Sequence, residues 1–170
     1  IKSDNPDAIY ASGYFFTAGP MVSQIRAAGL NQPIVGQEGY DSQKFIEIAG
    51  SASEGVMITT SLDRDSSSPE TQMFIKGFGK KAGYPADMVA ASGHTALLVL
   101  ADALKMSGST DAAALREAIA KTNLMASTGQ ISFNALGEVQ KDVQVQIVKD
   151  GNWRHHSTII DPVLLSPPSK

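Results

Sequence analysis

The most constraining feature of the sequence is a strand, helix and strand pattern over residues 6–40, PDAIYASGYFFTAGPMVSQIRAAGLNQPIVGQEGY. Residues 8–12 are a short run of strand formers, and a second strand begins at Ile34 and ends at Gly36. Between the strands, apolar residues follow the i, i+3, i+4, i+7 spacing of a helix with one buried face, namely Ala18, Met21, Val22, Ile25 and Ala28. Gly29 lies where a glycine ends a helix. The pattern predicts two parallel strands joined by a right-handed crossover.

The loops that follow these two strands carry the candidate ligand-binding side chains. Tyr14 comes just after the first strand, and Glu38 follows the second. The carboxyl ends of parallel strands meet at one edge of a sheet, and open α/β sheets bind ligands there. We therefore expect Tyr14 and Glu38 to share one rim.

The middle of the chain is predicted to be mostly helical. A third parallel strand is expected over residues 54–60, followed by a loop at 61–68 that is rich in Ser and Asp. Helices are predicted over residues 43–48, 69–83, 88–106 and 111–122, with caps at Asp41 and Ser42, at Ser68 and at Thr110. The helix at 88–106 is apolar on nearly every face and must be covered on more than one side. No strand is predicted between the last three helices, so the sheet that covers them is expected from elsewhere in the protein.

The C-terminal part is predicted to be β-structure. A short strand is expected over residues 130–133, and the sequence NALGE after it is a turn. Val143, Val145 and Ile147 alternate with glutamines, which is typical of a half-buried strand. Asp150 and Gly151 form a hairpin signal, and residues 153–160 are expected to pair back. Residues 162–170 contain three prolines and are interpreted as an extended tail.

Composition excludes several classes of protein and site. The net charge of -3 and the lack of a basic cluster argue against a nucleic-acid surface. The longest uninterrupted apolar run, residues 96–101, is too short to span a membrane. His155 and His156 are adjacent, so on a strand they point to opposite faces and cannot bind one metal ion together. With no cysteine, no GxSxG, no HExxH and no phosphate-binding loop, we expect no metal, no cofactor and no enzymatic activity.

Four segments in order give the chain a family resemblance: PDAIYASGY, IRAAGL, PIVGQEGYDS and SEGVMITTS. Together they resemble the periplasmic substrate-binding proteins of branched-chain amino acid ABC transporters, the Leu/Ile/Val-binding family. The resemblance runs through nearly the whole chain. It implies an α/β protein with the type I periplasmic binding fold, in which Rossmann-like parallel sheets form two lobes.

The resemblance implies a division of the chain between those lobes. Family members are roughly twice as long as this chain, a size typical of two domains, so we expect it to be the C-terminal half of a longer protein. Residues 1–61 would then be part of the C-terminal lobe, residues 62–68 a crossover, and residues 69–128 helices of the N-terminal lobe. Residues 129–161 would return to the C-terminal lobe. With half of the fold absent, exposed apolar faces and open strand edges predict that the chain associates with itself.

Three residues match ligand-contacting positions of the resembled family. Glu38 would receive the α-ammonium group of a bound amino acid; the alternative is a solvated loop glutamate. Tyr14 would contact the ligand near its amino end; the alternative is a half-exposed turn tyrosine. Val89 would lie against the ligand side chain, although core packing is the simpler interpretation. Asp63 and Asp65 are interpreted as charges of the crossover loop.

The resulting hypothesis is a solute-binding component of an ABC importer. Its ligand would be a branched-chain or aromatic amino acid, or a related small carboxylate, held between two lobes that close by hinge bending. Its partner would be the membrane permease, and its location periplasmic or extracellular, with a lipoprotein anchor compatible with either. The alternative is a ligand-sensing receptor or regulatory domain of the same fold for an amide, urea or aromatic acid. Glu38 favours the α-amino ligand.

Overall fold

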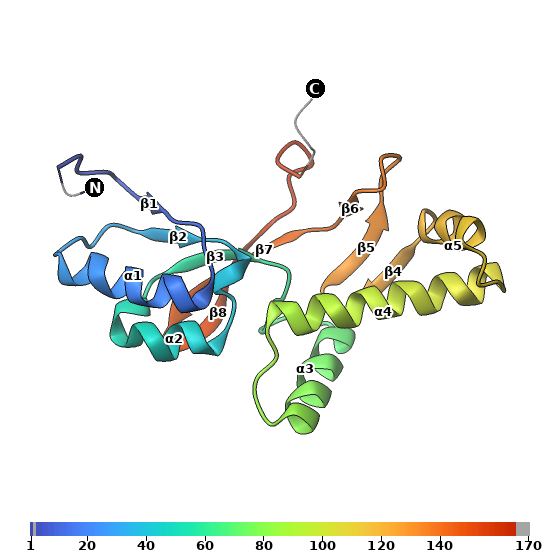
Figure 1. Ribbon diagram of the computed structural model, residues 1–170, viewed down its shortest axis with the longest axis horizontal. Helices are drawn as coiled ribbons and strands as arrows, with labels where there is room; N and C mark the ends of the chain where they lie inside the picture. Colours follow the sequence, from blue (N-terminus) through green and yellow to red (C-terminus); the bar gives the residue numbers. More distant parts are fainter. Residues whose placement is uncertain (2, 166–170) are drawn as a thin grey trace. The chain divides into compact units, whose positions relative to one another are not determined.

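The chain passes three times between two units, which are described separately. The computed structural model describes residues 1 and 3–165 (Figure 1). Unit 1 comprises Ile1–Asp65 and Gln144–Thr158, and unit 2 comprises Ser66–Val143 together with the segment that starts at Ile159. Both units mix helices and strands, so the predicted α/β class is confirmed.

Unit 1 is built on a five-stranded sheet with the strand order β1-β2-β3-β7-β8. Its strands are β1 (Ile9–Tyr10), β2 (Ile34–Gly36), β3 (Met57–Thr60), β7 (Val143–Lys149) and β8 (Asn152–Ile159). The first three are parallel, as the sequence predicts, and β7 runs antiparallel to β3. β3 begins three residues later than expected because a 3-10 turn, η2 (Gly50–Ser53), and the residues after it precede the strand.

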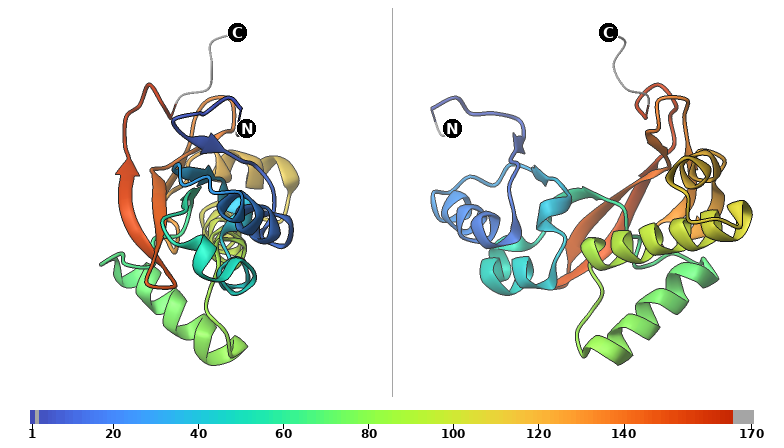
Figure 2. Two further views of the ribbon diagram at one scale, coloured as in Figure 1. Left: turned by 90° about the vertical axis from the view of Figure 1, so that its left-hand side faces the viewer. Right: turned by 45° about the vertical axis from the view of Figure 1, so that its right-hand side comes forward.

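Two helices of unit 1 cover one face of this sheet (Figure 2). α1 (Phe15–Ala27) joins β1 to β2, and α2 (Gln43–Ala49) joins β2 to β3. Both crossovers advance in the same direction along the sheet, and right-handed crossovers of that kind place their helices on the same side. α1 ends at a Schellman motif around Gly29, whose φ is 78°. The core of unit 1 consists of residues from both helices, the sheet and the segments that connect them: Ile9, Ala18, Val22, Ile25, Leu30, Ile34, Tyr40, Phe45, Ile46, Ala49, Val56, Ile58, Val148 and Trp153.

The cap of α2 differs in part from the expectation. Ser42 is the N-cap and accepts a hydrogen bond from the Lys44 N–H, as predicted. Asp41 does not cap the helix, because its buried carboxylate binds the guanidinium group of Arg64 and the hydroxyl group of Thr60 instead.

The alternation in β7 predicts the strand correctly, but the fully buried face is not the one that carries Val143, Val145 and Ile147. Gln146 and Val148 are buried, whereas Val145 and Ile147 are half-buried. Gln146 pairs with Ile58 of β3, so its side chain lies on the face that the helices cover. Its amide donates a hydrogen bond to the Asp63 carboxylate, which accounts for one of its buried polar groups.

Unit 2 contains three helices and a sheet of its own. The helices are α3 (Pro69–Ala82), α4 (Met88–Ser107) and α5 (Ala112–Ile119), and the antiparallel sheet has the order β4-β5-β6. β4 (Asn123–Ala126) was not expected, and it pairs with β5 (Gly129–Phe133), which pairs in turn with β6 (Val139–Gln140). α4 passes along the sheet with α3 beside it (Figures 1 and 2). Val99, Ala126 and Ile131 form a core between α4 and the sheet.

Two expectations for this part of the chain are corrected, and a third stays a prediction. The unit 2 helices do not lack a sheet altogether, since the hairpin of β4 and β5 supplies one. β5 and β6 pair with β4 and not with the sheet of unit 1, and the chain re-enters unit 1 at Gln144; the division of residues 129–161 between two lobes stays a prediction. The N-cap of α5 is Asp111, whose carboxylate accepts from two backbone N–H groups, and not Thr110.

The expected extended tail at 162–170 is only partly described. Residues 162–165 form a turn, in which the Leu165 N–H donates to the Asp161 carbonyl oxygen, so this part is not extended. Residues 166–170 lie outside the described residues.

α4 is long and apolar enough to cross a membrane by length and composition, with a mean hydropathy of 1.2. The sequence interpretation missed this because Ser92, Gly93 and His94 interrupt the apolar run while the surrounding alanines keep the average high. A packed helix of a globular domain meets the same criterion. Because α4 contributes Val99 to the unit 2 core, we interpret it as a packed helix.

Candidate functional site

The candidate site is the edge of unit 1 formed by the loops after β1 and β2, residues 11–14 and 37–41, which we call the rim. Gln37 joins the two loops, since its side-chain amide donates to the Gly13 carbonyl oxygen at 2.7 Å and accepts from the Gly39 N–H at 3.1 Å. Tyr40 adds a second link through its hydroxyl group, which donates to the Ala11 carbonyl oxygen at 2.7 Å. The predicted proximity of the two loops is therefore confirmed.

Tyr14 is held in place at the amino end of α1. The Thr17 hydroxyl donates to the Tyr14 carbonyl oxygen at 3.0 Å, and the carbonyl also accepts from the N–H groups of Thr17 and Ala18. The Tyr14 ring lies close to Gly39, where an added Cβ would be 3.2 Å from a ring carbon. The side chain itself is 62% exposed, so its ring and hydroxyl group are available to a ligand.

Glu38 lies on the same rim, at the start of the 3-10 helix η1 (Glu38–Tyr40), and its side chain is exposed. Within residues 1 and 3–165, its carboxylate has no hydrogen-bond or ion-pair partner. The carboxylate of Asp41, the residue that follows η1, differs because it pairs with Arg64. A carboxylate without a partner suits a cationic group, and the next residue, Gly39, lies against the Tyr14 ring. The alternative of a solvated loop glutamate is compatible with the same geometry.

Tyr40 anchors the rim to the core of unit 1. It is fully buried and stacks on Phe45 at 5.1 Å between ring centroids, and Phe45 stacks on Trp153 at 5.6 Å. Burial, with a smaller contribution from Tyr10, raises the pKa of Tyr40 above its ordinary value of 10.0. The ring is therefore a neutral structural support of the rim.

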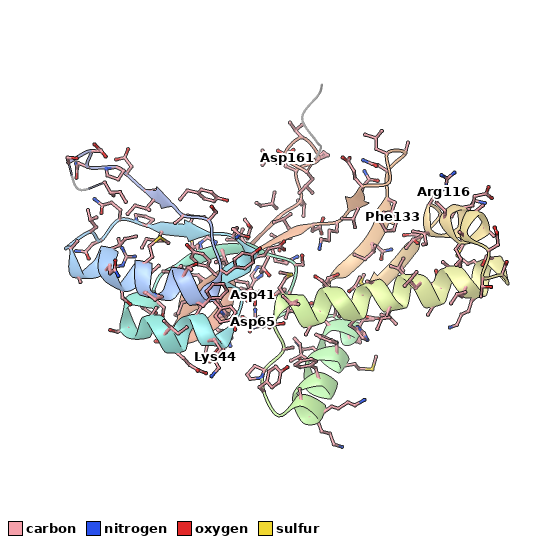
Figure 3. All side chains as sticks on the ribbon, in the orientation of Figure 1. Asp41, Lys44, Asp65, Arg116, Phe133 and Asp161 are labelled. Atoms are coloured by element: carbon pink, nitrogen blue, oxygen red, sulfur yellow. The ribbon has the colours of Figure 1, made fainter. Side chains whose placement is uncertain are left out.

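Beneath the rim, a polar network holds the chain where it leaves unit 1, over residues 62–65 (the 62–65 segment). The Asp63 carboxylate accepts from Gln146 at 3.1 Å and lies 3.2 Å from Nδ1 of His155. Asp65, labelled with Asp41 in Figure 3, pairs with Arg154 at 3.0 Å. The two aspartates are thus structural links to β7 and β8, a role that the sequence interpretation missed.

Val89 belongs to unit 2, in the first turn of α4, and is 68% exposed. Core packing within the described part of unit 2 therefore does not explain the apolar residue at position 89.

His94, further along α4, stacks on Phe74, and its Nδ1 lies 3.0 Å from the Ser127 hydroxyl group. Phe74, His94 and Ser127 line an apolar cavity of about 700 Å³ between α3 and α4, and Val89 is not part of that lining. At its margin, the pKa of Glu70 lies below the ordinary value because the carboxylate accepts hydrogen bonds from its own backbone N–H and from Ser68.

The sequence interpretation missed Gln37 and Tyr40, which position the rim. A signal was present, because both belong to the same QEGY turn as Glu38 and both carry hydrogen-bonding groups.

In residues 1 and 3–165, no group of three His, Asp or Glu side chains is arranged to hold a metal ion.

Comparisons with known proteins agree on the fold. A family model described as periplasmic binding protein matches residues 1–152. The leucine-, isoleucine-, valine-, threonine- and alanine-binding protein of Pseudomonas aeruginosa is 26% identical over 142 residues, which cover 82% of this chain and 37% of that protein. A leucine-binding protein of known structure from Thermotoga maritima is 34% identical, with a TM-score of 0.85, and the match covers 93% of this chain and 46% of the other.

A third relative shows the fold alone. It is a solute-binding protein from R. palustris solved in complex with benzoate, with 24% identity and a TM-score of 0.81, and the match covers 92% of this chain and 44% of the other. The chain therefore spans less than half the length of each of these three relatives.

Proposed function

The chain belongs to the periplasmic binding protein family, and on that basis we propose that it is part of the solute-binding component of an ABC importer. The proposed ligand is a branched-chain or aromatic amino acid, or a related small carboxylate. The proposed partner is a membrane permease, and the proposed location is periplasmic or extracellular. The protein would bind its ligand without changing it, and two of its relatives are named as amino acid binding proteins.

The observation that carries the proposal is the exposed Glu38 carboxylate on the rim, beside Tyr14. Within the described residues it has no partner, and it follows a parallel strand at the edge where α/β sheets bind ligands. An α-ammonium group that loses its water on binding needs a counter-charge, which Glu38 supplies. Tyr14 adds a flat apolar wall and a hydroxyl group.

The test is calorimetric titration of the protein expressed from its complete gene, with leucine, phenylalanine and a keto acid. Loss of one partner of a buried, hydrogen-bonded charge pair costs about 2–5 kcal/mol, so with the ligand enclosed between two lobes Glu38→Gln should weaken amino acid binding at least about 30-fold. The keto acid, which lacks the ammonium group, should bind the wild type weakly.

Glu47→Gln is the matched control, because Glu47 is an exposed glutamate of unit 1 that pairs with Lys44 away from the rim. It should leave binding unchanged. Binding of urea, an amide or benzoate without any amino acid would contradict the proposal and favour a sensor of the same fold.

Two further assignments are also proposals. Unit 1 would belong to the C-terminal lobe of the complete protein, and residues 69–128 to its N-terminal lobe. Val89 would contact the ligand side chain in the complete protein, as its exposure permits. Val89→Ala should then weaken leucine binding a few-fold and leave alanine binding unchanged.

A further inference from the structure

A second aromatic ring extends the rim beyond Tyr14. Phe16 lies in the first turn of α1 and is 58% exposed. Its ring is parallel to that of Tyr14, with an interplanar angle of 3° and a distance of 5.8 Å between centroids. The ring of Phe15 meets the Phe16 ring edge-on, with 5.4 Å between their centroids. Phe16 is therefore fixed by two aromatic contacts although most of its side chain faces solvent.

Along this part of unit 1, a charged residue, Glu38, is followed by the ring of Tyr14 and then by the apolar ring of Phe16. Gly39, next to Glu38, approaches the Tyr14 ring, and the Tyr14 ring stacks on Phe16. A ligand with its ammonium group at Glu38 would pass along Tyr14 and meet Phe16 only if its side chain were long. The side chain of alanine ends at Cβ and gains nothing from Phe16.

From this arrangement we infer that Phe16 is a specificity-determining residue, which selects amino acids with an aromatic side chain over those with shorter apolar ones. The inference rests on the proposed function and names the substrate class of the same site. Aromatic rings gain from stacked or edge-to-face contacts beyond the area that they bury. A phenyl ring of a ligand would join the Tyr14 and Phe16 pair as a third ring, whereas a leucine side chain would gain area alone.

The test compares L-phenylalanine, L-leucine and L-alanine by calorimetric titration of the protein expressed from its complete gene. Wild type should bind phenylalanine more tightly than leucine and should bind alanine weakly. Phe16→Ala should weaken phenylalanine binding about three- to tenfold and leucine binding less than about twofold. Phe16→Tyr, which keeps the ring, should retain the preference.

Tyr84→Ala is the matched control, because Tyr84 is an aromatic residue of unit 2 that is similarly exposed, at 60%, and contacts the ring of Phe78. It should leave both affinities unchanged. An unchanged ratio of phenylalanine to leucine affinity in Phe16→Ala, or an equal loss for both ligands, would overturn the inference alone. Absence of amino acid binding to wild type would overturn the proposed function and this inference together.

Discussion

At the scale of single residues, the rim depends on a close approach that only glycine permits. A Cβ added at Gly39 would lie 2.2 Å from the Gly13 carbonyl oxygen and 3.2 Å from the Tyr14 ring. The Gly13 oxygen is backbone, so it cannot move aside as a flexible side chain could. The two loops of the rim therefore pack at backbone contact, and Gln37 bridges them at the same point.

We predict that Gly39→Ala lowers the free energy of unfolding by about 1–3 kcal/mol, because the loops must separate to admit the methyl group. Urea unfolding measures this change. Gly93→Ala is the control, since Gly93 lies in α4 with nothing within 4 Å of an added Cβ. It should raise stability by about 0.5–1 kcal/mol. Equal urea midpoints for Gly39→Ala and wild type would show that the rim is not packed in this way.

Tyr40 predicts a pH dependence of stability. Its pKa is raised by burial, so the folded state holds the phenol proton more tightly than the unfolded state. The resulting stabilisation is complete below the unfolded pKa of 10.0 and is lost as the pH rises through the higher folded pKa. Between about pH 8 and about pH 10.5, the urea midpoint of wild type should fall more than that of Tyr40→Phe.

The same variant has a cost at neutral pH. Tyr40→Phe removes the hydrogen bond to the Ala11 carbonyl oxygen and should lose about 0.5–1.5 kcal/mol of stability at about pH 8. Other titrating groups are common to both proteins and cancel in the comparison. If the two midpoints fell in parallel, burial of the Tyr40 phenol would have no energetic consequence.

At the scale of elements, the buried pair of Asp41 and Arg64 joins the rim to the 62–65 segment. The Asp41 side chain is fully buried and that of Arg64 is 18% exposed. Asp41→Asn should lower the free energy of unfolding by about 2–4 kcal/mol, because it leaves a largely buried guanidinium group without its carboxylate. The exposed pair of Lys44 and Glu47 offers a contrast: Glu47→Gln should cost less than about 1 kcal/mol. Similar costs for both variants in urea unfolding would mean that burial of the first pair is unimportant.

Elements defined by local chemistry were predictable from the sequence, and those defined by distant partners were not. Ser42 and Ser68 cap helices as predicted, because a cap needs only the N–H groups two or three residues ahead. β4 was missed because its four residues, NLMA, form a strand only through pairing with β5. Asp111 and Thr110 are neighbours with similar capping chemistry, so the residue pattern alone did not choose between them.

The same distinction applies to the candidate site. The crossover rule placed Tyr14 and Glu38 on one rim, because strand direction alone decides which loops meet. The links made by Gln37 and Tyr40 depend on side-chain geometry across the two loops, which no spacing in the sequence encodes. The family resemblance inferred from four segments is confirmed by the family match, whereas ligand binding by Tyr14, Glu38 and Val89 stays a prediction.

At the scale of the whole molecule, each unit leaves apolar surface uncovered. In unit 1, half-buried residues of adjacent strands form a patch on the sheet face opposite α1 and α2: Val35, Met57, Val145 and Ile147. No described helix of unit 1 covers this face, and β1 is an edge strand whose outer side has no partner strand in the described chain. In unit 2, α4 exposes Leu97, Leu100 and Leu104.

These surfaces lead us to predict that the 170-residue chain, when purified alone, forms dimers or larger assemblies. Apolar patches and open strand edges are stabilised by association, since a second copy removes them from water. Light scattering after size-exclusion chromatography, at several protein concentrations, measures the mass. Leu97→Ser combined with Leu100→Ser should raise the monomer fraction, whereas Leu136→Ser, at an exposed turn position, should not. A single monomeric species at every concentration would mean that neither patch is sufficient to drive association.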